Sequence, residues 1–173
     1  LGLVADWYKK QTKDWLVRAP IAGVYGLGAP YINGGDVKNT GIEVALNWNE
    51  KKGDFSYGAG VNLTYNKNEV TRIANDEGII HGPEDVLSEG TGEYYRSEIG
   101  KPIGFFWGYK TAGIFQNEAQ VNATEAKLSG AQPGDVIFID TTGDGEITED
   151  DRTMIGDPNP DFILGFNLNM QYK

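Results

Sequence analysis

Cysteine is absent from the 173 residues, which excludes disulfide scaffolds, cysteine-ligated zinc and cysteine nucleophiles. Histidine occurs once, as His81, and we expect a loop histidine without a catalytic role, because a general base needs positioned partners. No apolar run approaches about 18 residues, so the sequence predicts no transmembrane helix. The chain begins at Leu1 without an initiator methionine or a signal-peptide pattern, and we expect a piece of a longer protein.

Basic residues are also few, with 15 Lys and Arg against 25 Asp and Glu and a net charge of −10. This balance argues against a nucleic-acid partner, since phosphate binding needs an excess of basic residues. The sequence has no GxSxG motif and no Gly-x-Gly pair at a strand-to-helix turn, which disfavours a serine hydrolase and a nucleotide site. Carboxylate pairs are abundant, but the sequence places no two of them across a glycosidic bond. We therefore predict that the chain is not an enzyme.

What the sequence does contain is strict alternation of apolar and polar residues in three segments, 41–48, 55–66 and 162–172. A period of two sustained over about eight residues predicts β-strands, and residues 1–10 make a weaker fourth. The polar turn 49–54 carries Gly53, which is available for a positive φ. The sequence thus predicts an all-β chain of antiparallel strands at about 1–10, 41–49, 55–73 and 162–173.

The two faces of these strands differ in kind. One face is uninterrupted and apolar, with aromatic residues towards the strand ends, and it includes Leu46, Val61, Leu63 and Leu168. The other face carries Asn, Gly, Ser, Thr and Gln with a single charge, Glu43, a composition that suits a crowded or water-filled lumen. The pattern favours a membrane β-barrel, and a soluble antiparallel sheet with one buried face is the alternative.

The connections at 11–40 and about 74–161 are long. The second is too long to lack structure in a compact domain, so we expect a strand or hairpin within Phe105–Phe115 and a short helix after the N-cap Asn117. Four aromatic residues near its middle either stack on a sugar ligand or pack the loop onto itself, the commoner role of such a cluster. These residues are Phe105, Phe106, Trp107 and Tyr109.

The most acidic stretch contains residues 140–151, DTTGDGEITEDD, whose spacing resembles a calcium loop of the EF-hand or dockerin kind. Such a loop must bring about six hard oxygens around one ion, with a sharp turn at its sixth position, here Gly145. The expected ligands, at positions 1, 3, 5, 7, 9 and 12, are Asp140, Thr142, Asp144, Glu146 (through its carbonyl), Thr148 and Asp151. Thr148 also predicts a cap for a short helix over 149–154. The alternative is an acidic turn without an ion.

The order of five stretches resembles SusC/RagA-type TonB-linked outer-membrane transporters. They are ADWYKKQTKDWLV (5–17), NGGDVKNTGIEVALNWN (33–49), FSYGAGVNLTYNKNEVTRI (55–73), IGKPIGFFWGYKTAGIFQNEAQV (99–121) and the run from PGD to the end (133–173). The most specific are GKPIGFFWGYKTAGIF and the segment from PGD through PNPDFILGF. The resemblance departs at Thr142, where the family commonly has asparagine.

The resemblance implies that residues 1–173 are a fragment, from the C-terminal half, of a TonB-dependent β-barrel domain. The four strands would belong to a partial transmembrane β-barrel, and residues 74–161 would form a large extracellular loop region containing short helices. The implied function is import of oligosaccharides or peptides across the outer membrane, with a SusD-like surface lipoprotein as lid and energy from the TonB system acting through an N-terminal part that lies outside this sequence. Calcium at 140–151 would be structural. The alternative function is a soluble, calcium-stabilised carbohydrate-binding β-domain.

Overall fold

The computed structural model describes residues 1–18 and 31–173, and the chain divides into two compact units. The first unit comprises Leu1–Ile80, Ser97–Ile103 and Asn159–Lys173, and the second comprises His81–Arg96 and Gly104–Pro158. Among the described residues, no helix has the length and apolar character needed to cross a membrane.

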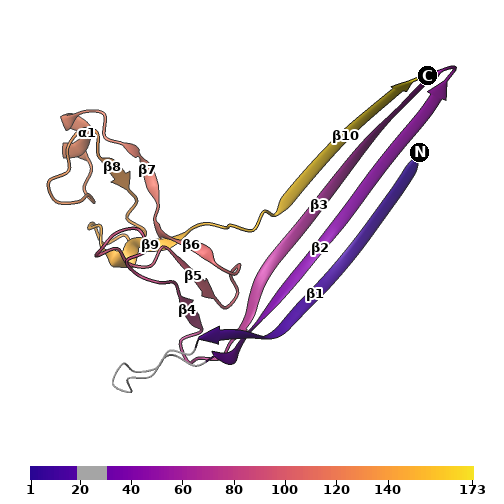
Figure 1. Ribbon diagram of the computed structural model, residues 1–173. Helices are drawn as coiled ribbons and strands as arrows, with labels where there is room; N and C mark the ends of the chain where they lie inside the picture. The colour runs from indigo at the N-terminus through magenta and orange to yellow at the C-terminus, as the bar shows by residue number, and fades with distance from the viewer. Residues whose placement is uncertain (19–30) are drawn as a thin grey trace. The chain divides into compact units, whose positions relative to one another are not determined.

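Four long strands form an antiparallel sheet in the first unit, in the order β1-β2-β3-β10 (Figure 1). Their bounds are Gly2–Arg18 for β1, Tyr31–Lys52 for β2, Phe55–Ile73 for β3 and Phe162–Tyr172 for β10. Strands β2 and β3 are joined by a tight turn in which Gly53 has a φ of 65°, a conformation that glycine adopts without steric cost. The predicted all-β, antiparallel fold class is confirmed.

Two strands are longer than the alternation predicts: β1 continues to Arg18 instead of ending near residue 10, and β2 begins at Tyr31 instead of residue 41. Gly34 and Gly35 look like loop residues in the sequence, but they make room for side chains of β1. A Cβ added to Gly35 would lie 2.9 Å from the ring of Trp15, and one added to Gly34 would collide with Val17. The remainder of the expected connection, residues 19–30, lies outside the described residues.

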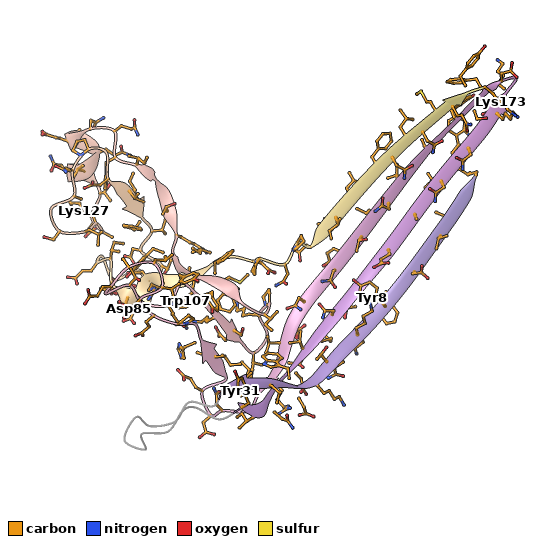
Figure 2. The ribbon with its side chains drawn as sticks, in the orientation of Figure 1. Tyr8, Tyr31, Asp85, Trp107, Lys127 and Lys173 are labelled. Carbon is orange, nitrogen blue, oxygen red and sulfur yellow. The ribbon has the colours of Figure 1, made fainter. Side chains whose placement is uncertain are left out.

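The core of this unit lies at one end of the sheet. Val37, Val70 and Ile73 are buried there, and Trp15, Ile80 and Ile103 pack against them. The segment 97–103 is tied to β3, because the Val70 N–H donates to the Lys101 carbonyl at 2.9 Å and the Gly100 N–H donates to the Val70 carbonyl at 2.8 Å. Elsewhere along the strands, side chains project from both faces, as Figure 2 shows around Tyr8.

The second unit consists of short elements. One sheet has the strand order β4 (Ile79–His81), β5 (Tyr95–Glu98), β6 (Phe105–Tyr109) and β9 (Arg152–Gly156). The first residues of β4 and the last residues of β5 belong to the first unit. Strands β7 (Thr111–Ile114) and β8 (Val136–Phe138) form a second sheet. The expected short helix is α1, Glu118–Ala123, whose N-cap Asn117 accepts the N–H of Gln120 as predicted.

Two details of the expected local structure can be compared with the structure. Of the strand or hairpin expected within Phe105–Phe115, the strand alternative is correct: the segment holds β6 and β7, which form no hairpin because β6 pairs with β9 whereas β7 pairs with β8. The helix expected over 149–154 is a single 3₁₀ turn, Glu149–Asp151, after which Arg152 begins β9. The turn ends there because pairing with β6 satisfies the backbone of residues 152–156.

Candidate functional site

One face of the long sheet is apolar and open. Its exposed large side chains include Leu46, Val61, Leu63 and Leu168, which are 42%, 39%, 42% and 57% exposed. Aromatic rings meet at two places on the sheet: Trp48 and Tyr57 lie near the β2–β3 turn with ring centroids 5.3 Å apart, and Tyr65 and Phe162 lie where β10 begins with centroids 4.9 Å apart. A soluble sheet would bury such a face, so this one requires an apolar environment or partner.

The opposite face is built from asparagine side chains that lie over glycines. Gly60 of β3 pairs with Asn47 of β2 and Asn167 of β10, and a Cβ on Gly60 would lie 2.7 Å from Asn47 Oδ1 and 2.6 Å from Asn167 Nδ2. The neighbouring row repeats this arrangement with Gly58 between Asn49 and Asn169. Glycine is required because the two amides converge where its side chain would be. In these two rows the result is a close-packed surface of uncharged polar groups.

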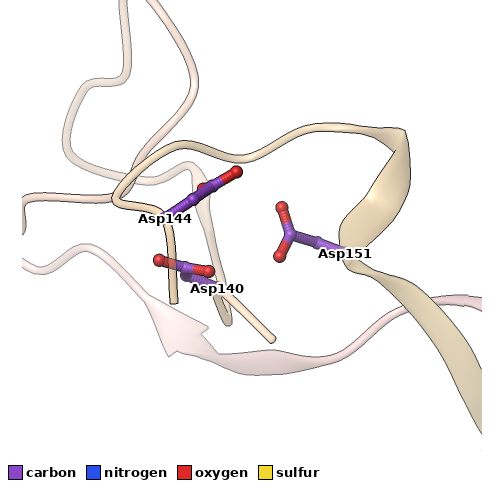
Figure 3. A group of neighbouring side chains, drawn as sticks. All are labelled: Asp140, Asp144 and Asp151. Carbon is purple, nitrogen blue, oxygen red and sulfur yellow. The ribbon is translucent and has the colours of Figure 1, made fainter. Parts of the chain in front are cut away.

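The acidic loop 140–151 brings three carboxylates together. One oxygen of each of Asp140, Asp144 and Asp151 lies within 4.8 Å of the others, and Figure 3 shows the three groups facing a common space. Thr142 Oγ1 lies 3.1 Å from both Asp140 Oδ1 and Asp151 Oδ1. Four of the six predicted ligand positions therefore have side-chain oxygens in or next to this group.

Asp151 is fully buried and is held by the protein itself. Its carboxylate accepts the backbone N–H groups of Thr148 at 2.8 Å, Thr141 at 2.8 Å and Thr142 at 3.1 Å. These hydrogen bonds, that from Thr148 above all, lower the pKa of Asp151 to about 2 in spite of burial. Asp151 is thus the residue that organises the closed loop.

Several of the predicted ligands make further hydrogen bonds within the loop. The backbone N–H of Gly145 donates to Asp140 Oδ2 at 2.8 Å, and this bond lowers the pKa of Asp140. The hydroxyl of Thr148 accepts the N–H of Asp150, which makes it a helix cap as predicted. The Glu146 side chain is exposed and is not among the three clustered acids, although the Glu146 N–H donates to Asp144 Oδ1 at 2.9 Å.

The aromatic cluster is packed on itself and does not present open ring faces together. Phe105 is fully buried, so its ring is not accessible to a ligand, in keeping with the packing alternative. Trp107 of β6, labelled in Figure 2, carries the Arg96 guanidinium 3.6 Å above its ring centroid. Tyr109 packs against Phe138 with centroids 5.3 Å apart. Phe106, 41% exposed, is the most accessible of the four.

A polar cavity of about 780 Å³ in the second unit was not predicted from the sequence. Its buried acid is Glu93, which accepts hydrogen bonds from the Gly82 N–H at 3.0 Å and from Arg96, and lies 3.0 Å from His81 Nδ1. Burial raises the pKa of Glu93, but the bonds from His81 and Gly82 and the charge of Arg96 outweigh it and hold that pKa below its ordinary value. The lining includes Glu84, Asp85, Glu93, Arg96, Glu149, Asp150 and Arg152. Because these residues come from separate segments of the chain, no local sequence motif predicts the cavity.

Comparison with known proteins extends over nearly the whole chain. It is 30% identical over 179 residues to TonB-dependent receptor P3 of Formosa agariphila, covering 100% of this chain and 17% of that receptor. It is 26% identical to TonB-dependent receptor SusC of Bacteroides thetaiotaomicron, covering 97% of this chain and 16% of SusC. The resemblance to SusC/RagA-type TonB-dependent receptors is confirmed.

The fold agrees with this assignment. The structure of the RagAB peptide transporter matches 99% of this chain, with a TM-score of 0.68 and 24% identity, and the match covers 18% of the RagAB chain. No family model matches. By the coverages given above, the chain spans about one sixth of the length of the receptors that it matches. The names of these relatives describe receptors and a transporter, and none of them describes an enzyme.

Proposed function

We propose that the chain contributes barrel wall and surface loops to an outer-membrane, TonB-dependent importer of glycans or peptides. The observation that carries this proposal is the four-stranded sheet with an open apolar face on one side and a packed glycine–asparagine face on the other. A lipid bilayer accepts the first face, and a polar lumen accepts the second. The proposed alternative, a soluble carbohydrate-binding domain, would need to cover residues such as Leu63, which is 42% exposed.

Adjacent residues of β3 test the proposal because they lie on opposite faces. The chain has no native cysteine, so Leu63→Cys and Asn62→Cys each introduce a single thiol into it. The measurements are made on the full-length protein in outer membranes. We expect a membrane-impermeant maleimide to label Asn62→Cys. At Leu63→Cys we expect an attached nitroxide spin label whose relaxation is accelerated by oxygen dissolved in the lipid. Equal labelling of both thiols by the aqueous reagent would contradict a lipid-facing Leu63.

Substrate and partners follow from the relatives as part of the same proposal. SusC and the RagAB peptide transporter suggest a glycan or a peptide as cargo, a SusD-like surface lipoprotein as lid, and the TonB system as energy source. Residues 74–161 would then be the extracellular region. Co-purification of a surface lipoprotein with the tagged receptor, together with uptake assays of oligosaccharides and peptides that depend on TonB, tests these assignments.

We also infer a structural calcium ion at the acidic loop. The support is the group formed by Asp140, Asp144 and Asp151, whose oxygens converge within 4.8 Å. Asp144 is the most available ligand, since it is exposed, whereas Asp151 already accepts three backbone N–H groups. A flexible arc of oxygens favours Ca²⁺ over the smaller Mg²⁺. Calorimetric titration with CaCl₂ should give binding heat that Asp144→Ala abolishes and the exposed control Glu146→Gln retains. Absence of heat at millimolar calcium would leave an acidic turn without an ion.

A further inference from the structure

The acidic loop and the polar cavity of the second unit meet at residues 149–152. The 3₁₀ turn Glu149–Asp151 ends the loop, and Glu149 and Asp150 line the cavity, as does the next residue, Arg152. Asp151 faces away from this lining, towards the loop, where its carboxylate binds three backbone N–H groups. One short segment is therefore part of both structures.

The loop end of this segment is rigidly specified. Thr148 and Asp151 form a capping box in which each side chain accepts from the backbone of the other. The Thr141 hydroxyl adds a bond of 3.0 Å to the Asp151 carbonyl, so both the side chain and the main chain of Asp151 are held by the start of the loop. If this buried carboxylate left its place, the N–H groups of Thr141, Thr142 and Thr148 would lose their shared acceptor, which is costly.

The cavity end is held by Arg152. Its guanidinium donates to the backbone carbonyl of Glu93, and a Cβ added to the adjacent Gly92 would lie 2.8 Å from Arg152 Nη1. The bare backbone at Gly92 therefore allows the guanidinium to approach. Glu93 in turn accepts from Gly82 and Arg96 and contacts His81, so the carbonyl that Arg152 holds belongs to the residue that organises the cavity.

We propose that closure of the acidic loop determines the shape of the cavity, with Asp151 and Arg152 as the positioning residues that connect them. With the loop closed, Asp151 places the start of β9 so that Arg152 reaches Glu93. With the loop open, Arg152 loses its position and the segment 90–96 loses a cross-link to β9. The cavity is then available in its observed shape only while the loop is closed. This conformational coupling does not depend on the importer function or on calcium.

Hydrogen exchange measured by mass spectrometry on the full-length protein, in EDTA, tests the coupling. Asp151→Asn keeps the shape of the side chain but weakens its acceptance of three N–H groups, and we expect at least about fivefold faster exchange in both 140–151 and 90–96. Arg152→Met keeps the aliphatic stem and removes the donors, and it should accelerate 90–96 to a similar extent while leaving 140–148 unchanged. Asp150→Asn, on the same turn, is the matched control and should change neither segment.

Two results would overturn the proposal. One is faster exchange in 140–151 of Asp151→Asn with wild-type exchange in 90–96. The other is wild-type exchange in 90–96 of Arg152→Met. Because the second variant leaves the acidic loop intact, its result can refute the proposal even if Asp151→Asn disrupts the whole unit.

Discussion

Thr148 and Asp151 close the acidic loop reciprocally: the Thr148 N–H donates to Asp151 Oδ2 at 2.8 Å, and the Thr148 side chain accepts from the backbone of the turn that Asp151 ends. The pair satisfies orphan N–H groups at the start of the turn, and these donors stabilise the negative charge of Asp151 without an ion. The loop thus combines a self-sufficient end at Asp151 with an available carboxylate at Asp144, and its response to pH and to calcium should differ between those two residues.

The pH dependence of the protein's stability should show the ionisation of Asp151. Its pKa is about 2 in the folded protein and 3.8 ordinarily, so the charged form is favoured by folding. The stabilisation is therefore complete above about pH 4 and is lost as the pH falls towards 2. In calcium-free thermal unfolding scans, the advantage of the wild type over Asp151→Asn should shrink across that window. A constant difference from pH 5 to pH 2 would show that the Asp151 charge contributes nothing.

A methyl group on Gly60 should disrupt the polar face. Its Cβ would lie 2.6 Å from Asn167 Nδ2, so Gly60→Ala forces the amides apart and should lower the free energy of unfolding by about 1–3 kcal/mol. Gly2→Ala in β1 is the control, since its Cβ would have no neighbour nearer than 3.9 Å, and it should change stability by less than about 0.5 kcal/mol. Urea unfolding of the full-length protein in lipid vesicles measures both, and equal effects would refute the close packing.

Arginine should be tolerated differently on the two faces of β3. Leu63→Arg places a charge in lipid under the proposed orientation and should cost about 2–4 kcal/mol near the bilayer midplane. Asn62→Arg, one residue away, should leave folding nearly intact and change permeation through the lumen instead. Vesicle-based unfolding and single-channel conductance distinguish the outcomes. If both variants lost the same stability, the assignment of faces would fail.

Substitutions of two neighbouring phenylalanines should distinguish a structural role from a ligand-binding role in the aromatic cluster. Phe105→Ala removes a fully buried ring and should cost about 3–5 kcal/mol. Phe106→Ala removes a ring that is 41% exposed and should cost about 1 kcal/mol. Unfolding monitored by tryptophan fluorescence measures both. Substrate uptake that depends on Phe106 in a stably folded variant would assign it a recognition role, whereas a large loss of stability at Phe106 would contradict its exposure.

Several features of this protein are determined by the sequence alone. The alternation in 55–66 and 162–172 specifies strands because a one-residue shift would exchange the two faces. The turn at Gly53 follows from local chemistry, as do the N-cap at Asn117 and the cap at Thr148. Composition excludes disulfides and argues against nucleic-acid binding. The acidic loop is likewise a local pattern, and its three aspartates come together as the spacing predicts.

Tertiary structure decided the features that depend on contacts between distant residues. Strand β2 extends back to Tyr31 because Gly35 faces Trp15 across the sheet. A local pattern of residues cannot predict this pairing, because the two residues lie far apart in the sequence. The cavity around Glu93 is lined by His81, Arg96 and Arg152, which lie up to 71 positions apart in the sequence. Phe105 is fully buried, and the residues next to it in the sequence do not predict this burial. Periodicity and capping act within a few residues of chain and can be read from it, whereas burial and long-range hydrogen bonds exist only after the chain has folded.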